Sequence, residues 1–232
     1  MKRAACALWV CYAALAIAAG AGTNELLNAR DRQDGAAIQQ IISRRQDALW
    51  RDPKSAEAQY RLALAYSYGA EVAMELHDKK KSEALAEAGL DAAKGAVAGN
   101  DSNAEYHRLL GELCGQVIPA NPLLGTIKYG PCARDEINKA IQLNPKLALA
   151  YVTRGVGNYY LPPGLGGGLD LALNDFNKAI SLDPNLADAY LWKGLALRKG
   201  NHNAEARKAF ERALQLDPNR VWIKEQLSKT PA

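Results

Sequence analysis

The sequence has few aromatic side chains for a chain of 232 residues. It contains only two Phe, and aromatic residues make up 7% of the chain. β-Sandwiches and barrels of this size require many aromatic and β-branched residues, so the composition disfavours an all-β fold. The chain has instead 42 Ala, and 23% of its residues are charged. This composition favours closely packed helices.

The chain also lacks a strong charge of either sign. Its 29 Lys and Arg stand against 25 Asp and Glu, and two units of the net charge of +4 come from Lys2 and Arg3. Proteins that bind nucleic acids electrostatically carry clustered basic patches that neutralise many phosphates. We therefore expect no nucleic-acid partner.

The segment 1–21 differs in composition from the rest of the chain. Lys2 and Arg3 precede an uncharged run that lasts until Glu25, and the small residues Ala19-Gly20-Ala21 end its apolar part. A short positive end, a short apolar stretch and a small-x-small site are typical of a secretory signal peptide. We expect residues 1–21 to be cleaved and the mature protein to be periplasmic or secreted. The alternative is an uncleaved anchor, in which the leader alone contacts a membrane.

A sequence repeat is visible in the C-terminal half. The two phenylalanines, Phe176 and Phe210, mark equivalent positions of two successive copies. Small residues and a proline recur at the same offsets around each of them: Ala172, Ala179 and Pro184, then Ala206, Ala213 and Pro218. An aromatic residue and a glycine precede each copy: Tyr151 and Gly155, then Tyr190 and Gly194. The interval from Phe176 to Phe210 is typical of a repeat architecture.

The spacing is explained by two antiparallel helices in each repeat. Gly194 on the first helix and Ala206 on the second are small, so the two backbones can approach closely. Phe210 fills the space around that contact. Asp217-Pro218 ends the second helix and turns the chain into the next pair.

Two more copies upstream are divergent and contain insertions. The successive turns lie at Pro53, Asp101, Pro145, Pro184 and Pro218, and the intervals between them become shorter toward the C-terminus. We expect the first insertion to lengthen two helices and the second, within 115–131, to be irregular because of its prolines and glycines. The third creates the glycine-rich segment 161–168, which we expect to be a loop that serves as a structural hinge and not a phosphate-binding loop.

From about Ala36 to Leu227 the chain resembles the tetratricopeptide-repeat (TPR) superfamily. The sequence YHRLLG at 106–111, the long segment between helices and the Pro-x-x-x-Gly-Gly-Gly insert look like exported bacterial members. A similar insert occurs in eukaryotic regulators of microtubule dynamics. The resemblance implies an all-α, right-handed solenoid of antiparallel helix pairs, with about four repeats and a leading helix, over residues 36–227. A linker at 22–35 and a tail at 228–232 would flank it. The resemblance also implies a scaffold or adaptor without enzyme activity.

No catalytic constellation is visible in the sequence. The histidines His77, His107 and His202 lie on different repeats, and none stands beside a Ser or Cys motif. We expect no catalytic residue, no metal site and no cofactor. After removal of the leader, Cys114 and Cys132 remain, and they form either a disulfide or two buried thiols. We expect the disulfide, which would fasten the base of the segment 117–129.

The concave wall of such a solenoid is lined by the first helix of each pair. Eight residues are expected to face a partner there: Tyr60, Tyr68, Arg108, Glu112, Tyr159, Tyr160, Trp192 and Arg198. Tyr and Trp supply large contact areas with little rotamer entropy to lose, which suits peptide recognition. Members that clamp a C-terminal carboxylate carry Asn at a position that is here Leu64, Glu112, Val156 or Leu195, so we expect no such clamp.

The sequence therefore predicts an exported, non-enzymatic scaffold that binds a protein or peptide segment in its concave groove. The alternative is a periplasmic carrier of a small hydrophobic ligand, or a transporter-associated subunit, with the segment 117–129 as a lid.

Overall fold

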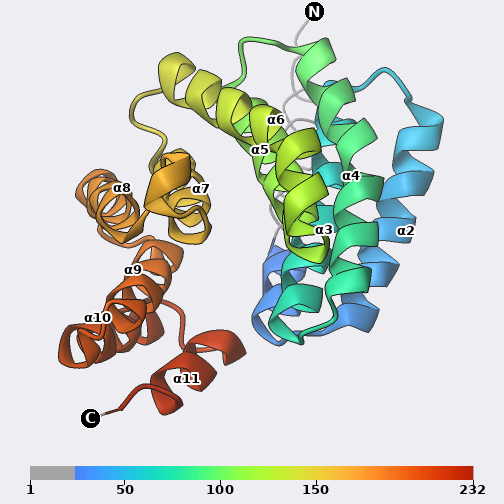
Figure 1. Cartoon of the computed structure of the whole chain (residues 1–232). Coiled ribbons are helices and arrows are strands. Elements are labelled where there is room, and N and C mark those ends of the chain that lie inside the picture. Colours follow the sequence, from blue (N-terminus) through green and yellow to red (C-terminus); the bar gives the residue numbers. More distant parts are fainter. Residues whose placement is uncertain (1–23, 232) are drawn as a thin grey trace, which may run out of the picture.

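The computed structural model describes residues 24–231, and this part of the chain is helical with short turns (Figure 1). The expected signal peptide lies outside the described residues. A helical stretch at 24–31 precedes the helices α2 (Gly35–Arg51), α3 (Ala56–Glu75), α4 (Lys79–Gly99), α5 (Ala104–Val117), α6 (Pro122–Leu143), α7 (Ala148–Tyr160), α8 (Leu169–Leu182), α9 (Ala187–Lys199), α10 (Asn203–Leu216) and α11 (Val221–Ser228).

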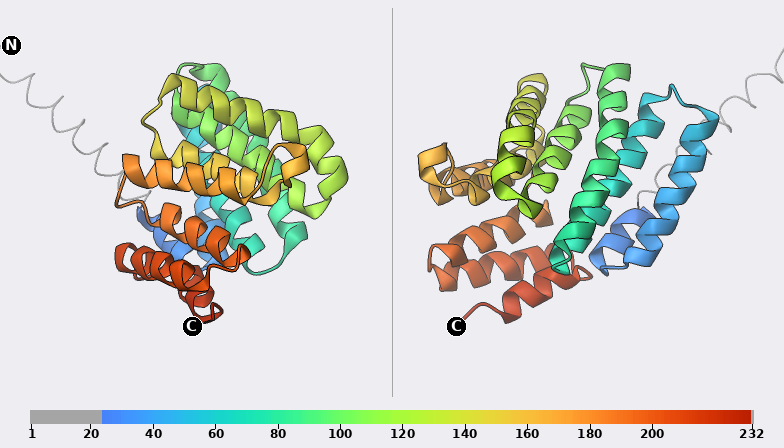
Figure 2. Two further views of the ribbon diagram at one scale, coloured as in Figure 1. Left: turned by 60° about the vertical axis from the view of Figure 1, so that its left-hand side comes forward. Right: turned by 45° about the vertical axis from the view of Figure 1, so that its right-hand side comes forward.

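The helices pack in sequential pairs, as the repeat pattern predicts. The pairs are α3 with α4, α5 with α6, α7 with α8, and α9 with α10, while α2 leads and α11 follows. The first helices of the pairs also contact one another in the order α3, α5, α7, α9. They form one side of the superhelix, called here the inner face (Figures 1 and 2). The predicted all-α repeat fold is confirmed.

Small residues let the paired helices approach, for the reason that the repeat spacing suggests. A Cβ on Gly155 would lie 2.5 Å from the Phe176 ring, and one on Gly194 would lie 2.6 Å from the Phe210 ring. Both rings are fully buried. Gly111 plays the same part in the preceding pair, where a Cβ would lie 2.7 Å from Ile137. Glycine at these positions is therefore required by packing.

The segment 115–131 is far more regular than expected. After a short 3-10 turn at Ile118–Ala120, α6 begins at Pro122, and the Asn121 side chain accepts a hydrogen bond from the Leu124 N–H. Proline suits the first turn of a helix because its missing N–H would be unpaired there in any case. Pro131 lies inside the same helix. The prediction of an irregular segment was wrong because it treated every proline as a helix breaker.

The other two insertions follow the predictions. The first lengthens α3 to 20 residues and α4 to 21. The third forms a turn in which Gly166 and Gly168 have φ values of 83° and 121°. This left-handed region is open to glycine at little cost, which explains why the glycines gather there.

Both flanks of the repeat region are more ordered than the sequence suggests. Residues 24–31, within the expected linker, are helical, and Leu26 and Ala29 in this stretch are buried. In the expected tail, Thr230 is 3% exposed, and its hydroxyl donates a hydrogen bond to the Gln226 carbonyl. Each flank covers apolar surface at an end of the solenoid, which otherwise would contact water.

The apolar core is divided between two halves of the molecule. We call residues 24–143 the N-terminal arm and residues 148–231 the C-terminal arm. One cluster of buried apolar side chains lies in the N-terminal arm, and two clusters lie in the C-terminal arm. Within the described chain, the first cluster shares no residue with the other two, although Ile141 near the end of α6 packs onto the C-terminal arm.

Cys114 in α5 and Cys132 in α6 form a disulfide, as predicted. Cys114 is buried against the apolar cluster of the N-terminal arm, and Cys132 packs at the edge of that cluster. The bond therefore joins the last turn of α5 to the middle of α6.

Two glycines of α7 offer a matched test of the helix contact. We expect Gly155→Ala to lower the free energy of unfolding by about 1–3 kcal/mol because its Cβ collides with the buried Phe176 ring. Gly157→Ala, where a Cβ meets no atom within 4 Å, should raise it by about 0.5–1 kcal/mol through helix propensity. Urea unfolding of the two variants measures both changes. Equal effects of the two substitutions would contradict the packing account.

Reduction of the disulfide should destabilise the fold. Cys114 and Cys132 are 18 residues apart, and releasing a loop of this length increases the entropy of the unfolded chain by the equivalent of about 3 kcal/mol. We expect a lower urea midpoint after reduction, and a native mass two hydrogens below that of the reduced chain. Free thiols that react in the native protein would contradict the bond.

Candidate functional site

The structure separates the eight expected partner-binding residues into two groups. Tyr60, Tyr68, Arg108 and Glu112 lie on α3 and α5 of the N-terminal arm. Tyr159, Tyr160, Trp192 and Arg198 lie on α7 and α9 of the C-terminal arm. The first group is charged and largely buried, and the second is mostly aromatic. The two groups have different chemical capabilities.

Arg108 is the centre of the charged group. Its side chain is 1% exposed, its Nε and Nη2 donate to Glu105 over 2.8 and 2.7 Å, and its Nη1 pairs with Glu112. Burial alone would lower the pKa of Arg108, but the carboxylates of Glu105 and Glu112 raise it well above its usual value. Tyr60 donates to Glu105, and Ser67 donates to Glu112. Arg108 thus holds the two carboxylates of α5 that accept hydrogen bonds from α3, and it is not presented to a partner.

Tyr68 is occupied by a second arginine. The Arg30 guanidinium lies 5.0 Å from the centre of the Tyr68 ring, within the range of a cation–π contact. Burial raises the pKa of Tyr68, an effect that the nearby Arg30 opposes. Arg30 comes from the helical stretch at 24–31, which the sequence analysis took as a linker. The expected partner-binding position is thus covered by the chain itself.

Three further charged residues, which no sequence motif indicates, form a group that contacts Arg30. They are Glu71 and Glu75 on α3, and Arg220 just before α11. Glu71 and Glu75 are four residues apart, and like charges at this spacing destabilise an isolated helix. This spacing was the one signal in the sequence, because two carboxylates on one buried helix face require a cation from elsewhere in the fold.

The second group forms a connected set of rings, called here the aromatic surface: Tyr159, Tyr160, Trp192 and Trp222. Ring centres are 5.8 Å apart between Tyr159 and Trp192, and 5.5 Å apart between Trp192 and Trp222. All the ring pairs are edge-to-face, the arrangement that the ring quadrupoles favour. Tyr160 at the border of the set is 59% exposed. The aromatic surface is therefore partly open to a partner.

A pocket of about 490 Å³ adjoins the aromatic surface. Its lining combines the rings of Tyr159 and Tyr160 with the proline- and glycine-rich turn and the start of α8: Leu161, Pro162, Pro163, Gly168, Leu169, Asp170 and Lys199. Lys199 donates to the Tyr159 carbonyl over 2.7 Å, and its Nζ lies 4.2 Å from the centre of the Tyr159 ring. Leu165 and Leu171, in the same turn and the same helix, are 66% and 46% exposed. The pocket thus lies in a region of exposed apolar side chains, which typically marks an interaction site.

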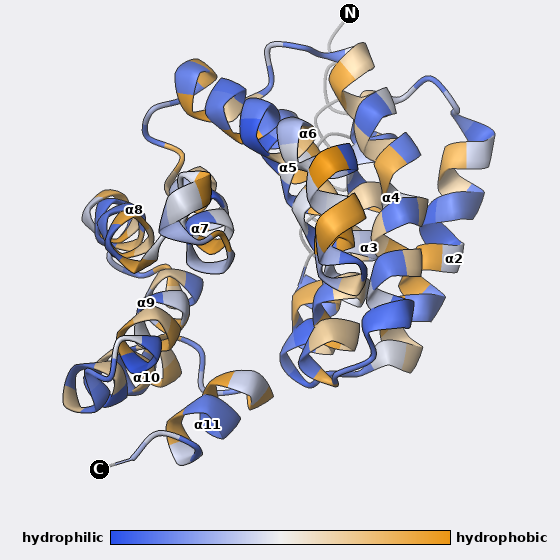
Figure 3. Cartoon of the chain, in the orientation of Figure 1, coloured by the Kyte–Doolittle hydropathy of each residue, from blue (hydrophilic) through white to orange (hydrophobic). Residues whose placement is uncertain are grey.

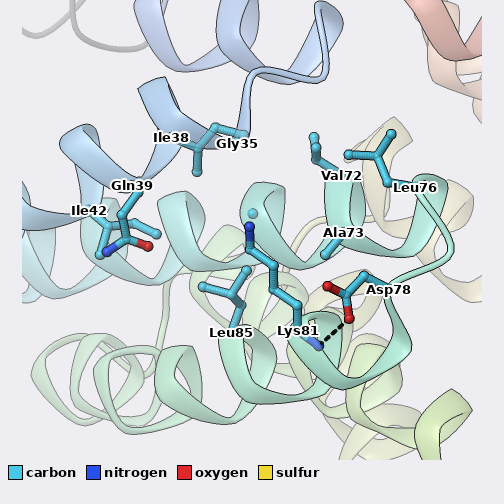
Figure 4. Close-up of a pocket in the computed structure, with 11 residues that line it drawn as sticks. Gly35, Ile38, Gln39, Ile42, Val72, Ala73, Leu76, Asp78, Lys81 and Leu85 are labelled. Carbon is cyan, nitrogen blue, oxygen red and sulfur yellow. Dashed lines mark hydrogen bonds between the residues drawn. The ribbon is translucent and has the colours of Figure 1, made fainter.

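A smaller pocket of about 230 Å³ lies between α2, α3 and α4 (Figure 4). Ile38, Ile42, Val72 and Leu85 provide apolar walls. Lys81 reaches across toward α2, and its Nζ lies 3.7 Å from where a Cβ on Gly35 would be. The volume is below the range of about 300–1,000 Å³ that is usual for ligand sites. We therefore take the larger pocket as the candidate binding site.

Arg198 has a structural role that the sequence analysis did not foresee. Its guanidinium donates to the Gln226 carbonyl and side chain over 3.1 and 2.6 Å, and to the Thr230 hydroxyl over 3.2 Å. These contacts hold α11 and the following residues against α9. Arg198 therefore fastens the end of the fold instead of facing a partner.

An apolar stripe also faces solvent at the start of α6. Leu123, Leu124 and Ile127 are 73%, 61% and 69% exposed, and Figure 3 shows the first turns of α6 as hydrophobic. These side chains do not close over the larger pocket, whose lining comes from α7, α8, α9 and the intervening turn. The structure gives no support to a lid, which was the alternative that accompanied the carrier hypothesis.

Residues 24–231 contain neither a candidate metal site nor a candidate membrane-spanning helix. This part of the chain holds no group of three or more His, Cys, Asp or Glu side chains arranged to bind a metal ion. Among its helices, none is both long enough and apolar enough to span a membrane. His107 is buried beside Glu136 and the Asp101 carbonyl and packs within its own repeat.

Models of known protein families match most of the described chain. The model for regulator of microtubule dynamics protein 1-3 matches residues 24–161, and two TPR models match 166–199 and 187–220. The first match covers more than half of the chain. The chain belongs to the family of regulator of microtubule dynamics proteins 1–3. The predicted TPR membership is confirmed, and this family and the TPR family are generally non-catalytic.

Curated relatives of this family member are much longer. Regulator of microtubule dynamics protein 3 of Xenopus laevis is 33% identical over 96 residues, which is 41% of this chain and 20% of the relative. The protein of the same name from Bos taurus is 33% identical over 111 residues, 48% of this chain and 21% of the relative. The matched part thus spans about a fifth of the length of these relatives.

Solved structures agree with the fold. A thermophilic TPR protein of Thermus thermophilus superimposes with a TM-score of 0.62 at 17% identity, covering 87% of this chain and 97% of that one. The HusA haemophore from Porphyromonas gingivalis gives a TM-score of 0.54 at 18% identity, covering 84% and 92%. At these identities the likeness shows the fold alone.

The charged group makes a prediction for this family member. Arg108→Met leaves the partly buried Glu105 and Glu112 without their cation, so we expect the free energy of unfolding to fall by about 3 kcal/mol. Arg134→Met removes the exposed pair with Asp135 and should cause no measurable change. Urea unfolding at pH 7 compares the two. Equal stability of both variants would show that Arg108 does not hold the inner face together.

Proposed function

We propose that this family member is an exported, non-enzymatic scaffold that binds a segment of a partner protein at the aromatic surface and the adjoining pocket. The observation that carries the proposal is the exposed apolar region around that pocket. It joins the partly exposed aromatic rings to Leu165 and Leu171. Aromatic side chains beside a preformed pocket are the usual energetic centre of a protein interface.

The aromatic surface suits a partner better than the charged group does. Arg108 and Tyr68 are engaged by other side chains of the same chain, and opening these contacts would leave carboxylates buried without a cation. Tyr160 and the pocket lining need no such rearrangement. A rigid, preformed surface also lowers the entropic cost of binding.

The chemical character of the pocket indicates the type of segment. Its rings and prolines favour an aromatic or branched apolar side chain as the anchor. The Lys199 ammonium bonds to a backbone carbonyl and retains two N–H groups for a carboxylate of the partner. We therefore infer a peptide segment that carries an apolar anchor next to an acidic group.

Export is part of the proposal and depends on residues 1–21. The positive end, the apolar run and the Ala19-Gly20-Ala21 site support cleavage by a signal peptidase. The disulfide between Cys114 and Cys132 supports an oxidising compartment such as the periplasm or the cell exterior.

A carrier of a small hydrophobic ligand is the second candidate. A volume of about 490 Å³ falls within the usual range for ligand pockets. Native mass spectrometry of the protein purified from its own host separates the two. An added mass of a few hundred daltons that is lost on unfolding favours the carrier, and a bare chain mass favours the scaffold.

Photo-crosslinking in the host tests the partner site. A photoreactive residue in place of Tyr160 should capture one defined protein, identified by mass spectrometry, because this position borders the pocket. The matched control is Trp50, a single aromatic side chain on α2 that is 84% exposed. The captured protein should then bind the purified scaffold, with affinity reduced about tenfold or more by Trp192→Ala.

Two results would contradict the proposal. One is crosslinking that is the same from Tyr160 and from Trp50, which would indicate random collisions. The other is unchanged affinity of the captured protein for the Trp192→Ala variant.

A further inference from the structure

Seven charged side chains meet where the first and last parts of the described chain come together (Figure 2). They are Arg30, Asp31, Glu71, Glu75, Asp188, Asp217 and Arg220, and they bring residues up to 190 positions apart into contact. The α6–α7 connection joins the two arms at one end of the molecule. This cluster lies at the other end, where the arms meet again.

Arg220 is the most enclosed member of the cluster. Its side chain is fully buried, its Nη2 donates to Glu71 over 2.7 Å and pairs with Glu75, and its Nη1 donates to the Arg30 carbonyl over 3.0 Å. Burial would lower the pKa of Arg220, but Glu71 and Glu75 raise it above its usual value. One guanidinium from the C-terminal arm thus holds both α3 and the end of the stretch at 24–31.

Arg30 makes the reciprocal connection. From the N-terminal arm, its Nη1 donates to Asp188 at the start of α9 over 3.1 Å, and its Nη2 lies 3.8 Å from Asp217. Its Nε and Nη2 also contact the neighbouring Asp31. The two arginines therefore cross between the arms in opposite directions.

Little apolar packing supports this junction. In the described residues, the buried apolar cluster of the N-terminal arm has no member in common with those of the C-terminal arm. α11 packs against α10 and makes no comparable contact with α3. Closure at this end therefore depends on interactions between charged side chains. The strength of these interactions varies with protonation, whereas that of an apolar contact does not.

We propose that Arg30, Arg220 and the five carboxylates around them form a clasp that closes the two arms and opens when the balance of charge in the cluster changes. The clasp goes beyond the proposed partner site and does not depend on it. Closure places Arg220 against Glu71 on the inner face, so opening would expose a second surface that the closed form hides.

The charge balance of the clasp makes it sensitive to pH. Two guanidiniums face five carboxylates, so proton uptake relieves the excess negative charge. Burial and the neighbouring carboxylate of Glu71 raise the pKa of Glu75 to about 7. Contacts with Arg220 and Gln33 act in the opposite direction but are weaker. The other charged groups around this junction are Arg30, Asp31, Asp188 and Asp217.

The sign of the dependence follows from these shifts. Because the pKa of Glu75 is higher in the closed form than in a free carboxyl group, closure takes up a proton and strengthens as the pH falls toward 5. Burial raises the pKa of Asp188, but Arg30 and Arg220 lower it below its usual value, so closure weakens again when strong acid protonates Asp188. For Glu75 alone, the equilibrium should favour closure about thirtyfold more at pH 5.5 than at pH 8.5.

A distance measured across the junction follows the opening directly. Spin labels at the exposed positions Gln40 on α2 and Ser228 on α11 lie on different arms, so their separation should increase when the clasp opens. In the doubly labelled protein, the ratio of closed to open molecules should fall by about thirtyfold from pH 5.5 to pH 8.5. An unchanged ratio would overturn the proposal.

Three variants separate the clasp from general stability. Arg220→Met should lower the ratio of closed to open molecules by about tenfold or more at both pH values, whereas Lys224→Met, on an exposed position of α11, should leave it unchanged. Glu75→Gln should reduce the pH dependence while the arms stay closed, because the amide imitates the protonated carboxyl. If Arg220→Met fails to fold, Glu75→Gln decides, and persistence of the full pH dependence in that variant would overturn the proposal.

Discussion

The close contact between a glycine on one helix and a buried side chain on its partner fixes much of this structure. At Gly155 and Gly194 the opposing side chain is a phenylalanine that leaves no room for a Cβ. These contacts set the distance and orientation within each pair, and the pairs in turn align α3, α5, α7 and α9 along one face. The aromatic surface exists because Tyr159 and Trp192 project from two successive helices of that series.

Electrostatics and apolar packing act in different places. Within each arm, buried apolar side chains hold the helices together, and the disulfide adds to the N-terminal arm. Between the arms, the buried arginines Arg30 and Arg220 make the contacts that close the open end. A buried ion pair contributes less net stability than apolar packing of the same size, but it confines the chain to one arrangement and responds to protonation. The molecule thus combines two apolar arms with a charged junction.

The sequence was sufficient to predict the helix pairs and not the junction. The regular interval between repeats, marked by Phe176 and Phe210, predicted the fold because small and large residues alternate at fixed offsets in every repeat. The disulfide was also predicted, from two cysteines left after the leader. The ion pair between Arg30 and Asp188 depends on the curvature of the whole superhelix. No local sequence pattern predicts that curvature. The role of Arg198 was missed for the same reason, since its partners Gln226 and Thr230 lie beyond the last repeat.

The central claim is that the apolar core is divided into two arms. Native-state hydrogen exchange with increasing urea tests it most directly, because amides that open together converge on one free energy of opening. The account predicts two levels, one shared by α3, α4 and α5 and another shared by α7 to α10. Convergence of all these helices on a single level would contradict the division and would show that the molecule unfolds as one unit.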